Sequence, residues 1–127
     1  MQKQKLLLVD DDHDFVDCAA EAINGMDVDL YLAYDGEEGL RVFEKERPRI
    51  VITDVVMPKM NGIDFANAVH AIDPEVIILA ITGHPDQLSK EEQFRELVRL
   101  SLLKPLMMED LLDSVELCLS NLRIANR

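Results

Sequence analysis

Polar residues that could handle a metal ion and a phosphoryl group follow four apolar segments that have the pattern of buried strands. Asp10 and Asp11 follow residues 6–9, Asp54 follows 50–53, Thr82 follows 76–81, and Lys104 follows 101–103. In open α/β sheets, ligands bind in the crevice outside the carboxyl ends of the strands. We therefore expect these carboxylates, the hydroxyl and the ammonium to meet at one site.

The acidic members of this set match the ligands that magnesium prefers. Mg²⁺ takes oxygen ligands, keeps several waters, and is usually bound by one or two carboxylates together with a phosphate. Asp11 and Asp54 can supply those carboxylates, and Asp10 can hold a metal-bound water. An incoming phosphoryl group is repelled by so much negative charge, so we expect the cation and Lys104 to offset that repulsion.

The segments between these residues alternate between strand and helix patterns, which is typical of a parallel sheet with helical crossovers. We expect strands at 6–9, 28–32, 50–53, 76–81 and 101–103. We expect helices at 15–23, around 40–43, at 65–72, at about 86–98 and at about 108–125. No repeat, linker or shift in composition divides the chain, so the pattern favours one three-layer α/β domain over residues 1–127.

Composition excludes several classes of function. The 127 residues suffice for one domain with a real core, and 48% of them are apolar. The net charge of −12, from 25 acidic and 13 basic residues, argues against sequence-independent binding to nucleic acid or to an anionic membrane. The longest apolar run, 76–81, is far shorter than a membrane span. We therefore expect a soluble, cytoplasmic protein.

The cysteines and histidines show no metal-binding pattern. Cys18 and Cys118 each fall in an expected amphipathic helix, without a CxxC or Cys/His pair. We expect both to be buried, reduced thiols. His13, His70 and His84 have no partner at a metal-ligand spacing, so we expect them to be exposed.

Taken in order, these motifs resemble the receiver domain of two-component response regulators. The resemblance rests on Val9-Asp-Asp-Asp12, on Asp54 followed by Met57-Pro58 and Gly62, on Thr82-Gly83, and on Lys104-Pro105. It covers essentially the whole chain, with spacings typical of the family. It implies a flavodoxin-like (βα)5 three-layer sandwich with five parallel strands in the order 2-1-3-4-5.

The resemblance also implies the chemistry. Asp54 would accept a phosphoryl group from a phosphohistidine on a histidine kinase or a histidine phosphotransfer protein, as an acyl phosphate. Mg²⁺ would be held by Asp10, Asp11, Asp54 and the main-chain carbonyl of Val56, with Lys104 beside the phosphoryl group. The domain would be a signalling switch acting on an unknown output partner. It would assist its own phosphorylation and dephosphorylation without being a turnover enzyme.

Further residues are implied in the readout and lifetime of the phosphorylated state. Thr82 would turn its hydroxyl toward a phosphoryl oxygen. Receivers commonly carry Tyr or Phe three residues before the lysine, and Ser101 stands there instead, so we expect a readout of small amplitude. The positions of Val56 and His84 tend to tune how long the phosphoryl group survives. A cis bond is implied at Lys104-Pro105, which an X–Pro sequence permits.

Two other functions fit parts of the sequence. Haloacid-dehalogenase-type phosphatases begin with an apolar strand followed by Asp-x-Asp, so that Asp10 would be the nucleophile and Asp12 the general acid. That interpretation leaves Asp54 and the segment to Gly62 unexplained, and the chain lacks room for a cap. A non-phosphorylated interaction module of the same fold is the second alternative, although such modules usually lose the acceptor or the acidic pair. The aspartate that takes up phosphate distinguishes these functions.

Overall fold

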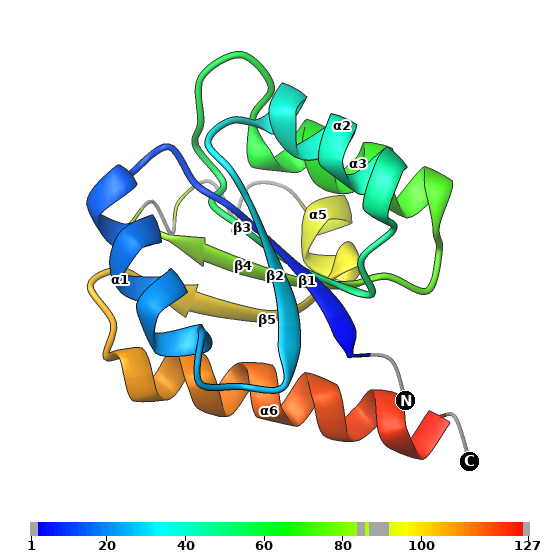
Figure 1. Ribbon diagram of the computed structural model, residues 1–127. Helices are drawn as coiled ribbons and strands as arrows, with labels where there is room; N and C mark the ends of the chain where they lie inside the picture. Colours follow the sequence, from blue (N-terminus) through cyan, green and yellow to red (C-terminus); the bar gives the residue numbers. More distant parts are fainter. Residues whose placement is uncertain (1–2, 84–85, 87–91, 126–127) are drawn as a thin grey trace.

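The computed structural model describes residues 3–83, 86 and 92–125, and it contains the predicted parallel sheet (Figure 1). The strands are β1 (Gln4–Val9), β2 (Val28–Ala33), β3 (Ile50–Thr53), β4 (Ile77–Thr82) and β5 (Val98–Leu103). All neighbouring strands are parallel, in the order β2-β1-β3-β4-β5. The predicted strand order is confirmed.

Helices cover both faces of the sheet. The described helices are α1 (His13–Ile23), α2 (Gly36–Glu46), α3 (Gly62–Ile72), α5 (Glu92–Leu97) and α6 (Met108–Ala125). Helices α1 and α6 lie on one face, and α2, α3 and α5 lie on the other (Figure 1). Side chains alternate along a strand, so Leu6 and Leu8 pack toward α1 and α6 while Leu7 and Val9 pack toward α2 and α3. The central strands are therefore buried on both faces, as in a doubly wound sheet.

Polar caps begin the helices that follow β1, β2 and β3. The cap side chains of Asp12, Asp35 and Asn61 accept hydrogen bonds from the amides of Phe15, Glu38 and Asp64, respectively. Each bond satisfies one of the amides that a helix start leaves without an internal partner, and such caps typically stabilise a helix by about 1 kcal/mol. These connections all lie at the carboxyl edge of the sheet, and the caps at Asp12 and Asn61 end the two loops in which Asp10, Asp11, Asp54 and Val56 stand.

The last helix-to-strand boundary differs from the sequence expectation. Strand β5 begins at Val98, three residues earlier than predicted, and the preceding helix ends at Leu97. From Val98 the exposure alternates residue by residue, the period of an edge strand with one face packed. The predicted helix at about 86–98 was therefore too long at its end, and residues 87–91 lie outside the described part. Thr82 is the last residue of β4, not the first after it.

The prediction that both cysteines are buried is wrong for Cys18. Cys118 is buried, but Cys18 lies exposed on the side of α1 opposite the buried Val16 and Ala19. His13 is exposed, as predicted, and stacks on Tyr34 with ring centroids 4.3 Å apart.

Other sequence expectations have mixed outcomes. His70 is partly buried, which differs from its predicted exposure, and His84 lies outside the described residues. The Lys104-Pro105 bond is cis. Within the described part of the chain, none of the helices has the length and apolar character that a membrane-spanning helix needs.

Candidate functional site

Three of the predicted aspartates meet at the carboxyl edge of the sheet. Asp10 and Asp11 follow β1, and Asp54 follows its neighbour β3. The backbone fixes this placement, because the Asp54 amide donates to the Val9 carbonyl at 3.1 Å and the Asp10 amide donates to the Ala33 carbonyl at 3.1 Å. One carboxylate oxygen from each aspartate lies within 4.8 Å of the other two. Asp10 and Asp54 are buried and Asp11 is exposed.

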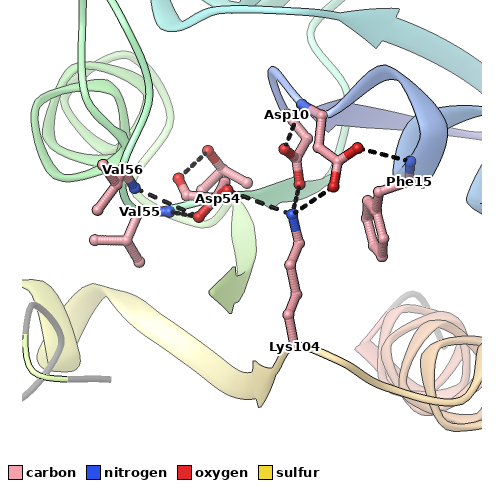
Figure 2. Close-up of polar contacts among 8 residues, drawn as sticks. Asp10, Phe15, Asp54, Val55, Val56 and Lys104 are labelled. Carbon is pink, nitrogen blue, oxygen red and sulfur yellow. Dashed lines mark hydrogen bonds and ion pairs between the residues drawn. The ribbon is translucent and has the colours of Figure 1, made fainter. Parts of the chain in front are cut away.

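Lys104, which follows the edge strand β5, brings a positive charge to these aspartates. Its Nζ lies 2.7 Å from Asp10 Oδ2, 3.4 Å from Asp54 Oδ2 and 3.9 Å from Asp12 Oδ2 (Figure 2). The residue follows β5, and its amide donates to the Thr82 carbonyl at 2.9 Å. Three carboxylates thus surround one ammonium, and with Asp11 nearby the site keeps an excess of negative charge.

Burial raises the pKa of the Asp10 carboxyl group. Loss of solvent raises the pKa of Asp10 from 3.8 to about 6, against the lowering effect of its bonds to Lys104 and the Asp12 amide. The negative charge of Asp54 also raises it. Burial alone would lower the pKa of Lys104, but its bond to Asp10 and the surrounding carboxylates raise that pKa. The pair is therefore a buried acid whose ionised form is costly, next to a lysine whose charge is favoured.

A hard divalent cation fits this arrangement. The converging groups are carboxylate oxygens, which Mg²⁺ and Ca²⁺ prefer over nitrogen or sulfur ligands. A single ammonium does not neutralise the carboxylates of Asp10, Asp11, Asp12 and Asp54, so a further positive charge would relieve their repulsion. The residues present are thus suited to a metal ion in both donor type and charge.

Asp54 is held in one orientation by its own loop. Its Oδ1 accepts from the Val55 amide at 2.6 Å and from the Val56 amide at 3.4 Å (Figure 2). The Thr53 hydroxyl donates to the Asp54 carbonyl at 2.9 Å. These contacts leave Oδ2 facing Lys104. The Val56 side chain is 42% exposed, and its role as a carbonyl ligand and in phosphate lifetime stays a prediction.

Gly62 allows α3 to begin directly against the backbone of the Asp54 loop. Its amide donates to the Val55 carbonyl at 2.8 Å. A Cβ at Gly62 would collide with the Asp54 carbonyl oxygen and would lie 2.8 Å from Val55 Cα. The glycine in this motif therefore has a packing reason, since any side chain would push the helix start away from Asp54.

Gly62→Ala is expected to destabilise the fold by about 2 kcal/mol, as is typical when extra atoms are forced into a filled space. Urea unfolding followed by circular dichroism measures the change. Gly25→Ala is the matched control, because a Cβ at Gly25 meets nothing within 4 Å. Equal stability of the two variants would contradict the close approach at Gly62.

The remaining predicted residues have different positions. Thr82 is buried at the end of β4 and is joined to Lys104 through the backbone. Ser101 is exposed on β5, three residues before Lys104, so its part in readout stays a prediction. His84 lies outside the described residues. The structure thus brings Thr82 beside the lysine and leaves the role of Ser101 open.

Sequence reasoning missed two residues that contact Lys104. Asp12 was part of the family motif but was given a chemical role only in the phosphatase alternative, yet it caps α1 and its Oδ2 lies 3.9 Å from Lys104 Nζ. The Phe15 ring lies below the same ammonium, with 4.5 Å between Nζ and the ring centroid. An Asp three residues before an apolar helical position is a signal for a cap. Nothing in local spacing points to a lysine that is 89 or more residues away.

Comparison with known proteins gives a consistent family. The family model described as "Response regulator receiver domain" matches residues 6–116. Among curated relatives, a response regulator receiver protein of Anaeromyxobacter sp. strain Fw109-5 is 31% identical over 110 residues, which are 87% of this chain and 46% of the relative. The sporulation initiation phosphotransferase F of Bacillus subtilis is 28% identical over 118 residues, which are 91% of this chain and 94% of the relative.

Solved structures agree with these relatives. The receiver domain of AraT, a response regulator from Geobacillus stearothermophilus, matches with a TM-score of 0.88 and 27% identity, covering 100% of both chains. A response regulator receiver domain protein from Clostridium thermocellum matches with a TM-score of 0.85 and 25% identity, over 96% of this chain and 98% of that one. The chain spans only 46% and 33% of the first two curated relatives, the second being the transcriptional regulatory protein YesN of Bacillus subtilis.

Proposed function

This chain belongs to the response regulator receiver domain family of two-component systems, and from that premise we propose that Asp54 is its phosphoacceptor. The observation that carries the proposal is the placement of the Asp54 carboxylate. Its Oδ1 is held by two backbone amides, while its Oδ2 lies 3.4 Å from Lys104 Nζ within the aspartate cluster. Asp10 is the poorer candidate, because its side chain is only 1% exposed and is ion-paired at 2.7 Å.

In the proposed step a carboxylate oxygen of Asp54 attacks the phosphorus of a phosphohistidine. The new bond joins that oxygen to phosphorus, the bond between phosphorus and imidazole nitrogen breaks, and the imidazole leaves with the electron pair and takes up a proton. The Lys104 ammonium pairs with the transferred phosphoryl oxygens, and the Thr82 hydroxyl donates to one of them. Water later attacks the phosphorus of the acyl phosphate, the bond between phosphorus and the Asp54 oxygen breaks, and inorganic phosphate leaves as Asp54 returns to its carboxylate. The domain is a signalling domain that takes part in both reactions.

The proposed metal is Mg²⁺, held by Asp10, Asp11 and Asp54 with the Val56 carbonyl. When bound, the cation supplies positive charge that offsets the repulsion between the carboxylates and the phosphoryl group. The convergence of three carboxylate oxygens within 4.8 Å supports this assignment. The Val55 and Val56 amides orient Asp54 through its Oδ1, and the Lys104 ammonium balances negative charge beside its Oδ2.

Magnesium is expected to stabilise the folded protein. A ligand that binds only the native state at about 100 times its dissociation constant stabilises that state by about 2.7 kcal/mol. Thermal melts with and without millimolar Mg²⁺, at constant ionic strength, measure the shift. Asp11→Asn should reduce the shift, whereas Asp64→Asn, an exposed carboxylate outside the cluster, should retain it. A wild-type melting temperature that does not respond to Mg²⁺ would count against the proposed metal site.

The proposed partners follow from family membership. The donor is a histidine kinase or a histidine phosphotransfer protein, and the phosphorylated domain acts on an output partner in the cytoplasm. Two relatives with similar segments are a sporulation initiation phosphotransferase and a transcriptional regulatory protein. The net charge of −12 favours protein partners over nucleic acid for this domain itself.

Mapping of the modified residue tests the proposed function. The protein is incubated with acetyl phosphate, with and without Mg²⁺, and its intact mass is measured. The acyl phosphate is then trapped by reduction, and peptide mapping identifies the modified residue. A single Mg²⁺-dependent adduct on Asp54 is the expected result. An adduct on Asp10 would support a phosphatase-type nucleophile instead. No adduct would favour an interaction module that works without phosphorylation.

A further inference from the structure

Phe15 places an aromatic ring against the lysine of the site. The residue lies near the start of α1, and its ring centroid is 4.5 Å from Lys104 Nζ (Figure 2). Its position is fixed from two sides. Its amide donates to Asp12 Oδ1 at 3.1 Å, and its partly buried side chain packs against the core under α1 and α6.

The same ammonium is held by charges on its other sides. Nζ lies 2.7 Å from Asp10 Oδ2 and 3.4 Å from Asp54 Oδ2, and in Figure 2 Asp54 and Phe15 lie on different sides of it. The face of an aromatic ring carries negative potential, so a nearby ammonium is attracted to it. Phe15 therefore offers Lys104 an attractive surface that is neutral overall and cannot compete as a metal ligand.

A hollow beside Lys104 gives its side chain space into which it could turn away from Asp54. A space of about 350 Å³ is lined by Asp12, Phe15, Lys104, Pro105 and Leu106. Lysine carries its charge on a flexible four-carbon stem, so Lys104 has other rotamers available to it. Without the ring, the side chain would have more room to turn toward the hollow and away from Asp54.

We propose that Phe15 is a positioning residue, whose ring holds the Lys104 ammonium where it pairs with a phosphoryl group on Asp54. The proposal rests on the function proposed above and adds a residue to it. Phe15 touches neither the metal ligands nor the phosphoryl donor in this role. It acts through Lys104 alone, so its effect must appear with a donor that has no protein surface.

The first measurement needs no phosphorylation. In wild-type protein, the Lys104 side-chain methylene protons next to Nζ should show the upfield NMR shift caused by a ring face. Phe15→Leu, which keeps apolar bulk and removes the ring, should return those protons to the shifts of other lysines. Phe15→Tyr should preserve the upfield position. Ordinary Lys104 shifts in the wild-type protein would overturn the inference while leaving the proposed function untouched.

The second measurement is the rate of phosphorylation by acetyl phosphate with Mg²⁺. Phe15→Leu is expected to slow it by about two- to fivefold, the size of an exposed ammonium–ring interaction, and Phe15→Tyr to restore it. Tyr31→Leu is the matched control, because its ring lies 5.9 Å from Lys5 Nζ, in a second lysine–ring pair away from Lys104. A Leu variant as fast as wild type, or a Tyr variant as slow as Leu, would refute the positioning role. Failure of the wild type to take up phosphate would instead refute the proposed function, whatever the Lys104 shifts.

Discussion

Asp54→Asn is expected to abolish uptake of a phosphoryl group from acetyl phosphate while leaving the fold intact. The amide that replaces the carboxylate is a poor nucleophile, so no acyl phosphate can form at this position. Its oxygen can still accept from the Val55 and Val56 amides, which now bond Asp54 Oδ1 at 2.6 Å and 3.4 Å. The variant also removes one negative charge from a crowded cluster, so its stability without metal should equal or exceed that of the wild type.

Intact mass spectrometry after incubation with acetyl phosphate and Mg²⁺ measures this loss. Asp64→Asn is the matched control, because it makes the same chemical change at an exposed carboxylate in the first turn of α3. The control should form the same adduct as the wild type. A phosphorylated Asp54→Asn variant would show that another aspartate is the acceptor, and circular dichroism excludes misfolding as the cause of a negative result.

Without metal, the contribution of Asp10 to the free energy of unfolding is expected to fall as the pH rises from about 4 to about 6. Burial raises the pKa of this carboxyl from 3.8 to about 6. In that window the folded state therefore binds more protons than the unfolded state, and raising the pH removes stability. A pKa rise of this size corresponds to a loss of at most about 3 kcal/mol in the free energy of unfolding, if Asp10 titrates independently of its neighbours. Above the folded pKa the whole cost of the buried charge is present.

Urea unfolding with a chelator at several pH values tests this, with Asp10→Asn as the comparison. Asp35 and Glu46 have pKa values lowered by bonds from the Glu38 amide and from Lys5, so they act in the opposite direction in both proteins. Their contributions cancel in the difference. The free energy of unfolding of Asp10→Asn, relative to that of the wild type, should increase as the pH rises from about 4 through about 6. A stability difference that is constant with pH would show that Asp10 does not titrate in this range.

The carboxyl ends of the strands made most of the site predictable. Residues 6–9 and 50–53 are continuous apolar runs, each followed at once by aspartate, and the sheet brings both runs to one edge. The positions of Asp10, Asp11 and Asp54 therefore follow from strand pattern alone. The ordered motifs then identified the family, which the comparisons confirm.

Other features depend on tertiary contacts that a local pattern does not carry. Strand β5 alternates partly buried and exposed residues, and its first residues also fit the end of a helix, so its start was placed three residues late. Cys18 is apolar enough for the core, but Val16, Ala19 and Ile23 already define the buried side of α1. The contact of Phe15 with Lys104 joins the first helix to the residue after the last strand, and no spacing within either segment indicates it.

The close approach of Gly62 to Asp54 makes the surroundings of this aspartate different on its two sides. On one side, the backbone of Asp54 is hydrogen-bonded to Val9 of β1 and contacts Gly62 at the start of α3, without space for a further carbon atom on that glycine. On the other side stand Lys104 and Thr82, whose strands are joined by the hydrogen bond between the Lys104 amide and the Thr82 carbonyl. The proposed phosphoryl group on Asp54 would face the Lys104 side, because Oδ1 is held by the Val55 and Val56 amides while Oδ2 lies 3.4 Å from Lys104 Nζ. Under the proposed function, we therefore expect the structural change on phosphorylation to involve β4 and β5, toward one edge of the sheet, more than the central strands β1 and β3.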